Sequence, residues 1–206
     1  APGVVERLGL GVEAMHKVNP RLVYAQSSGY GQDGLYRDYP AMDLTVQAMS
    51  GVMDITGFAE REPVKAGPAL CDFFAGVHLY GGIVTALYDR ERTGRGRTVE
   101  VSMLDAVYAS LSSQLGMSFG IGWEDAGRTG NRHGGLAESP YNVYPTTDGY
   151  IAIICVGEQH WKNLLDAMTR HDLKDDPRFA SLQTRVDHMD VVDDLVSGFT
   201  KQYSKQ

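Results

Sequence analysis

The stretch from Ala69 to Tyr88 is the most apolar part of the sequence and constrains the fold more than any other feature. It contains Asp72, His78 and three glycines, so it is too interrupted for a membrane span and instead predicts a buried helix. This helix is expected to begin at Asp72 and to end at Arg92. Large apolar side chains at helical spacing are expected to form its inward stripe: Phe73, Val77, Tyr80, Val84, Leu87 and Tyr88.

Helical and strand-like segments alternate on both sides of this helix. The apolar spacing predicts helices over 5–18, 43–56 and 104–117, and short strands over 21–26 and 97–103. Such alternation is typical of an α/β layered structure with Rossmann-like character. We therefore expect residues 1–119 to form part of a large domain.

The composition of the sequence changes after residue 119. Residues 120–139 are polar and hold six glycines, which indicates a linker or a functional loop. Two strand-like runs then flank Asp148-Gly149, a pattern typical of a β-hairpin, and a helical tail follows. We expect residues 120–139 to contain a linker and a glycine loop, and residues 140–206 to be part of a smaller α+β domain.

Composition excludes some classes of function. The net charge of −7 argues against a general nucleic-acid surface, because phosphate neutralisation needs a concentrated basic face. Cys71 and Cys155 lie far apart, which favours reduced, buried thiols in a cytoplasmic protein. The first residues carry no signal-peptide pattern, and the interrupted apolar stretch does not predict a membrane partner. No histidine pair has metal-binding spacing, so no metal is expected.

Asp72 is the most suggestive single residue, and two interpretations of it stay open. It precedes an apolar helix, where an aspartate is most often an N-cap. A carboxylate beside Leu70, Cys71 and Phe73 is also partly removed from water and can act as a nucleophile. Cys71 is the rival nucleophile, but the sequence places no base or cation beside it.

Taken together, the motifs resemble the family III coenzyme A transferases, which include formyl-CoA transferase, carnitine CoA-transferase and the related α-methylacyl-CoA racemases. The resemblance covers nearly the whole chain. The landmarks that carry it are, in order, Val4-Val5-Glu6-Arg7-Leu8-Gly9-Leu10-Gly11, Asn19-Pro20-Arg21-Leu22-Val23-Tyr24, Ser28-Gly29-Tyr30-Gly31-Gln32-Asp33-Gly34, Gln47-Ala48-Met49-Ser50-Gly51, Thr93-Gly94-Arg95-Gly96, Leu104-Asp105-Ala106, Gly130-Asn131-Arg132-His133 and Asp176-Pro177-Arg178-Phe179.

The resemblance implies that Asp72 is catalytic. The family's nucleophilic aspartate lies in a motif matched here by Pro68-Ala69-Leu70-Cys71-Asp72-Phe73-Phe74-Ala75-Gly76. The implied reaction moves coenzyme A from an acyl-CoA to a carboxylic acid through an aspartyl anhydride and an aspartyl-CoA thioester. It implies no metal, and no cofactor beyond coenzyme A as a substrate.

Further site residues follow from the resemblance alone. A glycine loop that covers the aspartate in formyl-CoA transferase corresponds here to Gly134 and Gly135, in a shorter loop with fewer glycines. Val4, Arg7 and Leu8 match positions that contact coenzyme A in the family. For Arg7, the alternative is a solvated helix charge.

The racemase branch is the alternative activity. The racemases place a histidine before an aspartate to move the α-proton, whereas this sequence has Met42 before Asp43. Methionine cannot act as an acid or a base, so the transferase is favoured, although Asp72 and Glu158 would both fit racemase-like positions. Met42, Asp43 and Glu158 are retained as candidates for the substrate pocket.

Family chains also extend beyond both ends of this sequence and form interlocked homodimers. We therefore interpret the chain as an internal piece, so an inactive fragment is a further alternative. The sequence does not indicate the donor or the acceptor acid.

Overall fold

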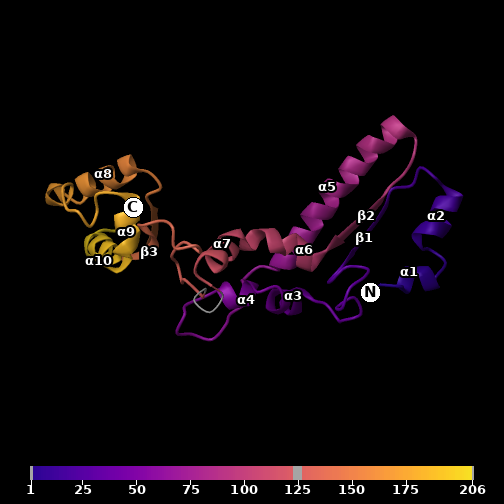
Figure 1. Ribbon diagram of the computed structural model, residues 1–206, viewed down its shortest axis with the longest axis horizontal. Coiled ribbons are helices and arrows are strands. Elements are labelled where there is room, and N and C mark those ends of the chain that lie inside the picture. The colour runs from indigo at the N-terminus through magenta and orange to yellow at the C-terminus, as the bar shows by residue number, and fades with distance from the viewer. Residues whose placement is uncertain (1, 123–126, 206) are drawn as a thin grey trace. The chain divides into compact units, whose positions relative to one another are not determined.

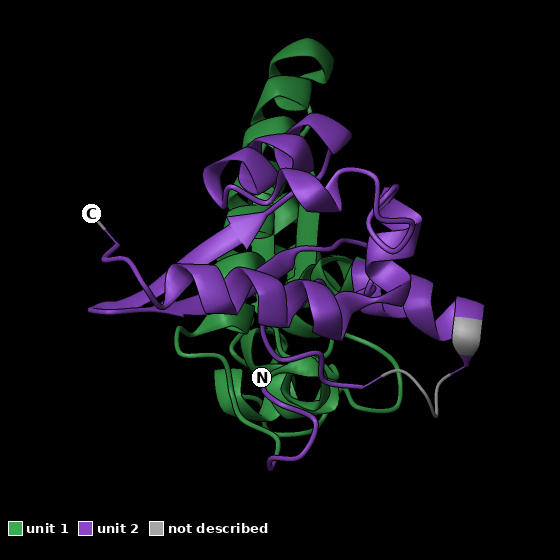
Figure 2. Ribbon diagram, turned by 90° about the vertical axis from the view of Figure 1, so that its left-hand side faces the viewer, with its two compact units in different colours: residues 1–56, 63–112 green, residues 57–62, 113–206 purple. Residues whose placement is uncertain are grey.

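The computed structural model describes residues 2–122 and 127–205. Two compact units divide the chain, one made of residues 1–56 and 63–112 and the other of residues 57–62 and 113–206 (Figure 2). The second unit thus includes a short segment from the first half of the sequence. The family domain boundaries expected at residues 119 and 139 stay a prediction.

The first unit is a mixture of helices around a small parallel sheet. The strands pair with Tyr24 opposite Thr98, and the long helix α5 packs against both of them (Figure 1). The mixed α/β class is confirmed, whereas a sheet of two strands does not establish Rossmann-like layering. The elements are α1 (Val4–Arg7), α2 (Val12–Val18), β1 (Tyr24–Ser28), α3 (Asp43–Met49), α4 (Val52–Ile55), α5 (Leu70–Thr93), β2 (Thr98–Ser102), α6 (Met103–Tyr108) and the 3-10 helix η1 (Ala109–Leu111).

Glycines divide two of the predicted helices. The segment predicted as one helix over 5–18 forms α1 and α2, with Gly9 at φ +73° between them. The segment predicted over 43–56 forms α3 and α4, with Gly51 at φ +90°. A left-handed residue ends a helix, and glycine adopts that conformation without a steric penalty.

The helix α5 has almost the predicted length, but the prediction of its inward stripe is wrong. Phe73 and Tyr80 are about 70% exposed, at 71% and 70%, and Val77, Val84 and Tyr88 are exposed as well. The buried face instead carries small side chains: Cys71, Ala75 and Ala86. Small side chains let a helix lie close to a sheet, and a Cβ at Gly82 would overlap the side chain of Val99 on β2.

By length and composition alone, α5 could also cross a membrane, and 17% of its most apolar window is buried within the structure. One such helix is weak evidence, because core helices of globular proteins pass the same test. Its small-residue face packs on β1, β2, α3 and α6, as in a folded domain. The expected absence of a membrane partner stays a prediction.

The second unit packs helices against an antiparallel hairpin. The hairpin predicted around Asp148-Gly149 is confirmed, with Tyr141 opposite Ile154. Its core is formed by Tyr144, Trp161, Leu165, Met168, Leu173, Phe179, Val192 and Val196. The elements are most of α7 (Ser112–Ile121), β3 (Tyr141–Thr146), β4 (Gly149–Ile154), α8 (Glu158–Ala167), the 3-10 helix η2 (His171–Leu173), α9 (Leu182–Asp187) and α10 (Met189–Thr200).

Candidate active site

Asp72 is the third residue of α5 and its side chain is exposed. The N-cap is Ala69, which makes no side-chain hydrogen bond, so the interpretation of Asp72 as the N-cap is wrong. A carboxylate in the first turn still benefits from the partial positive charge of the helix N-terminus. Asp72 also borders an open, largely apolar hollow of about 310 Å³, lined by Asp72, Phe73, Gly76, Val77 and Tyr80.

The hydrogen-bond acceptor at this helix end comes from another helix. Asp43, the first residue of α3, accepts a hydrogen bond of 2.8 Å from the backbone N–H of Cys71. Its other carboxylate oxygen accepts one of 2.7 Å from the side-chain amide of Gln47. Asp43 therefore makes contacts within the protein at the first turn of α5, one residue from Asp72.

Cys71 is placed as a buried thiol rather than as a nucleophile. Burial raises its pKa to about 11, and the negative charges of Asp43 and Asp72 contribute to the same shift. A thiol with this pKa is protonated at neutral pH, and the thiolate is the reactive form. The buried, protonated thiol agrees with the expectation that Cys71 is not the nucleophile.

Met42 is the N-cap residue of α3 and is 73% exposed. Its backbone N–H donates to Thr45 Oγ1 at 2.9 Å, and Thr45 donates back to the Met42 carbonyl at 2.8 Å. The hydrogen bond to the helix that carries Asp72 comes from the next residue, Asp43. The assignment of Met42 and Asp43 to a substrate pocket stays a prediction.

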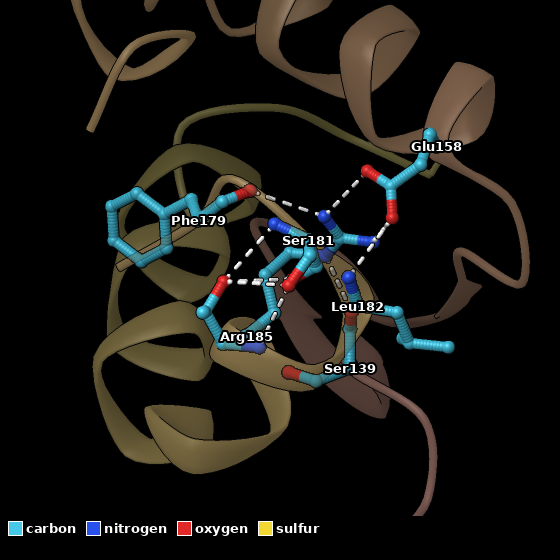
Figure 3. A network of polar contacts seen from close by, with 7 residues as sticks. Ser139, Glu158, Phe179, Ser181, Leu182 and Arg185 are labelled. Atoms are coloured by element: carbon cyan, nitrogen blue, oxygen red, sulfur yellow. Dashed lines mark hydrogen bonds and ion pairs between the residues drawn. The ribbon is translucent and has the colours of Figure 1, made fainter. Parts of the chain in front are cut away.

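Glu158 takes part in a structural ion pair. At the start of α8, its carboxylate accepts hydrogen bonds from both terminal nitrogens of Arg185, at 2.9 and 3.1 Å, and from the backbone N–H of Leu182 at 2.9 Å (Figure 3). These contacts hold the pKa of Glu158 below its usual range, and the hydrogen bonds from Arg185 make the largest contribution. A carboxylate of lowered pKa is a weaker proton acceptor, which does not favour a racemase role.

The glycine loop lies in the second unit and is folded around a histidine. The N–H groups of Gly135 and Ala137 donate to His133 Nδ1, at 3.2 and 3.4 Å. A Cβ at Gly134 would overlap the side-chain amide of Gln114, so this position is tightly packed. In this conformation the Gly135 N–H is already engaged. Donation from it to a reaction intermediate would require the His133 contact to open.

The Gly130-Asn131-Arg132-His133 landmark directly precedes this loop in the sequence, and hydrogen bonds join it to α10. Arg132 bonds Asp193 through its Nε at 2.8 Å, and the same carboxylate accepts from Tyr144 at 2.6 Å and Asn142 at 2.9 Å. Burial raises the pKa of Tyr144, and the nearby Asp193 carboxylate raises it further. The landmark therefore marks a partly buried polar anchor, which the sequence did not reveal.

The coenzyme A positions expected from the resemblance lie together on one short helix. Val4 and Arg7 are the ends of the four-residue helix α1, and Leu8 follows as its C-cap. Arg7 and Leu8 are exposed and Val4 is half-buried. Within residues 2–122 and 127–205 no cluster of His, Cys, Asp or Glu side chains could hold a metal ion.

The sequence model of CoA-transferase family III matches residues 1–206. The chain belongs to this family. An acetyl-CoA:oxalate CoA-transferase from Acetobacter aceti is 41% identical over 206 residues, which is all of this chain and 51% of that protein. A succinyl-CoA–D-citramalate CoA-transferase from Chloroflexus aurantiacus is 35% identical over 204 residues, or 98% of this chain and 50% of that protein.

Solved structures agree with the family assignment. A CaiB/BaiF family protein from Brucella suis superposes with a TM-score of 0.78 at 32% identity, covering 98% of this chain and 53% of that one. A hypothetical protein from Mycobacterium tuberculosis gives a TM-score of 0.83 at 28% identity, over 98% and 54%. The chain spans about half the length of the relatives it matches.

Sequence reasoning missed two side chains of this family III chain. Gln47 and Arg185 are both fully buried and hydrogen-bonded on several sides. Gln47 opens the Gln47-Ala48-Met49-Ser50-Gly51 landmark, and a polar residue within the apolar pattern of a helix was the available signal. Arg185 lies in a polar, charged segment, where nothing distinguishes it from surface residues.

Proposed function

We propose that the full-length protein containing this chain transfers coenzyme A from an acyl-CoA thioester to a carboxylic acid, with Asp72 as the nucleophile. The observation that carries the proposal is the position of Asp72. It is exposed on the first turn of α5, beside an apolar hollow, in the motif that matches the family's catalytic aspartate. An accessible carboxylate on a rigid helix end is suited to nucleophilic attack.

Each step exchanges one activated acyl bond for another. The Asp72 carboxylate attacks the thioester carbonyl, which gives an acyl–aspartyl anhydride and releases coenzyme A as a thiolate. The thiolate attacks the aspartyl carbonyl, so the donor acid leaves and an aspartyl–CoA thioester forms. The acceptor carboxylate then displaces the thiolate from Asp72, and the thiolate attacks the acceptor acyl group of the new anhydride. The product is the acceptor acyl-CoA, and the Asp72 carboxylate is restored.

Gly134, Gly135, Val4, Arg7 and Leu8 are proposed to assist this reaction in the family manner. Gly134 and Gly135 would approach the acyl–aspartyl intermediate, because a glycine backbone can come close to a reacting group. Val4, Arg7 and Leu8 would contact coenzyme A. The family resemblance also supports an interlocked homodimer in the cytoplasm, and light scattering on the full-length protein would measure its oligomeric state.

The names of the relatives suggest the acid. Oxalate, D-citramalate and glutarate occur in the names of the related transferases, and all are dicarboxylic acids. We therefore propose a small dicarboxylic acid as the acceptor, with acetyl-CoA or succinyl-CoA as the donor. A panel of acids, with mass detection of the new CoA thioester, identifies the pair.

The test of the nucleophile is chemical trapping in the full-length protein. Incubation with acyl-CoA and hydroxylamine should leave a hydroxamate on Asp72, located by peptide mass spectrometry. Asp72→Asn should keep the fold and lose CoA exchange. Asp89→Asn, on the same helix but in a surface ion pair with Arg97, serves as the control and should retain exchange. Ordinary turnover by Asp72→Asn would overturn the proposal.

A second measurement separates this activity from racemisation. In deuterated water, a racemase would introduce deuterium at the α-position of a 2-methylacyl-CoA. Since Met42 stands where a racemase carries histidine, we expect negligible α-deuteration. Rapid α-deuteration without an acceptor acid would instead identify a racemase.

A further inference from the structure

The first turn of α5 depends on a residue from α3. Helix N-termini leave backbone N–H groups without partners inside the helix, and the Ala69 cap makes no side-chain hydrogen bond. The Cys71 N–H donates instead to Asp43, which lies 28 residues earlier in the sequence, at 2.8 Å. A charged acceptor is a strong partner for such a group.

Gln47 fixes the orientation of the Asp43 carboxylate. Gln47 is fully buried one helical turn after Asp43, and its amide nitrogen donates to Asp43 at 2.7 Å. Its amide oxygen accepts from the backbone N–H of Ala66 at 2.8 Å. Two side chains of α3 thus hold both the segment that leads into α5 and the first turn of α5.

This arrangement bears directly on Asp72, the residue after Cys71. The Cys71 N–H belongs to the rigid peptide unit that joins Leu70 to Cys71, so the Asp43 hydrogen bond holds the start of the helical turn on which Asp72 lies. Both oxygens of Asp43 are engaged within the protein, which opposes rotation of its carboxylate toward a substrate. Asp43 is half-buried, whereas Asp72 is exposed, so the two carboxylates have different environments.

We propose that Asp43 is a positioning residue: with Gln47, it holds the first turn of α5 so that the Asp72 carboxylate points at the thioester. This inference rests on the proposed function. Nucleophilic attack requires reacting atoms in close alignment, and a displacement of about 1 Å can lower the rate by about 100-fold. Loss of Asp43 should therefore act on turnover more than on substrate binding.

The experiment compares kcat and KM for variants of the full-length protein. Asp43→Ala removes both hydrogen bonds, and we expect kcat to fall by about 10- to 100-fold while KM for acyl-CoA changes by less than about threefold. Asp43→Asn should have a kcat between those of wild type and Asp43→Ala. Its side-chain oxygen can accept from the Cys71 N–H, but its NH2 group would face the NH2 group of Gln47. The double variant Asp43→Asn/Gln47→Glu lets the asparagine amide donate to a carboxylate. It should recover turnover relative to Asp43→Asn.

The matched control is Thr45→Ala. Thr45 is exposed, and its hydroxyl exchanges hydrogen bonds with the backbone of Met42 at the N-terminus of the same helix. These side-chain hydrogen bonds involve neither Cys71 nor Gln47. Thr45→Ala should lower the melting temperature and leave kcat nearly unchanged. An equal fall in kcat for Thr45→Ala and Asp43→Ala would reduce Asp43 to a stabiliser of α3 and overturn the inference.

The wild-type protein separates the two possible failures. If it shows neither CoA exchange nor a hydroxamate on Asp72, the proposed function is wrong. If it shows both and Asp43→Ala keeps its kcat, the proposed function stands and the positioning role is wrong. A loss of binding with unchanged kcat would instead place Asp43 in the substrate pocket.

Discussion

The guanidinium of Arg185 meets the carboxylate of Glu158 through hydrogen bonds of 2.9 and 3.1 Å, although Arg185 is fully buried and Glu158 is 48% exposed. The same guanidinium donates to the carbonyl oxygens of Ser139 and Phe179, both at 3.1 Å (Figure 3). It also lies over the ring of Trp161. Arg185 therefore joins α8, α9 and the segment that precedes β3.

Replacing Arg185 should destabilise the second unit. Arg185→Met fills similar space but leaves the Ser139 and Phe179 carbonyls without this donor, so we expect a loss of about 3 kcal/mol of unfolding free energy. Urea unfolding followed by tryptophan fluorescence measures it. Arg170→Met is the control, because Arg170 forms an exposed pair with Asp172 that should contribute little. Equal losses would contradict the role of Arg185.

The Glu158 ion pair should make the stability of the second unit depend on pH in the acidic range. The Arg185 hydrogen bond holds the pKa of Glu158 below its unfolded value. The pair therefore contributes stability above the unfolded pKa, and this contribution is lost as the pH falls through the folded pKa. The difference in melting temperature between wild type and Glu158→Gln should be full near pH 6 and shrink below about pH 4.

The control for this acid dependence is Asp172→Asn. The pKa of Asp172 is also lowered, chiefly by its hydrogen bonds with Arg170, but the pair is exposed and should contribute little to stability. A difference for Glu158→Gln that stays constant from pH 7 to pH 3 would contradict the titration of Glu158 as its cause.

Cys71 should be chemically silent in the folded protein. Its pKa of about 11, raised first by burial, keeps it protonated at pH 8. We expect iodoacetamide to modify Cys71 only after unfolding, and Cys71→Ala to keep CoA exchange within about threefold of wild type. Peptide mapping and an exchange assay measure the two. Complete loss of exchange in a folded Cys71→Ala protein would make the thiol a rival nucleophile again.

The glycine loop should affect turnover more than binding. A Cβ at Gly135 would lie 3.3 Å from the His133 ring and from the Ser113 carbonyl, so Gly135→Val should distort the loop and lower kcat with little change in coenzyme A affinity. Gly127→Val is the control, since its Cβ would meet nothing within 4 Å. Weakened binding with normal turnover would place the loop in the coenzyme A pocket instead.

The neighbouring glycine offers a separate test of packing. Gly134→Ala should push aside the Gln114 amide, and this cost should be relieved in a Gln114→Ala background. Melting temperatures of the two single variants and of the double variant measure the coupling. Additive effects would show that Gln114 does not limit position 134.

Local sequence determined the elements that need only local interactions. The hairpin around Asp148-Gly149 and the extent of α5 follow from turn chemistry and from apolar content over a long window. The family followed from ordered landmarks along the whole chain. Gly9 and Gly51 could have signalled the helix breaks, because glycine readily adopts the left-handed conformation found there.

The tertiary structure alone decided which face of α5 is buried and which residue supports Asp72. Periodicity defines two faces of a helix, but α3, α6 and the two strands pack on the face that carries Cys71, Ala75 and Ala86, because small side chains allow close packing. The hydrogen bond between Asp43 and Cys71 joins residues 28 positions apart. Its formation depends on how α3 packs beside α5, a relation that no local pattern encodes.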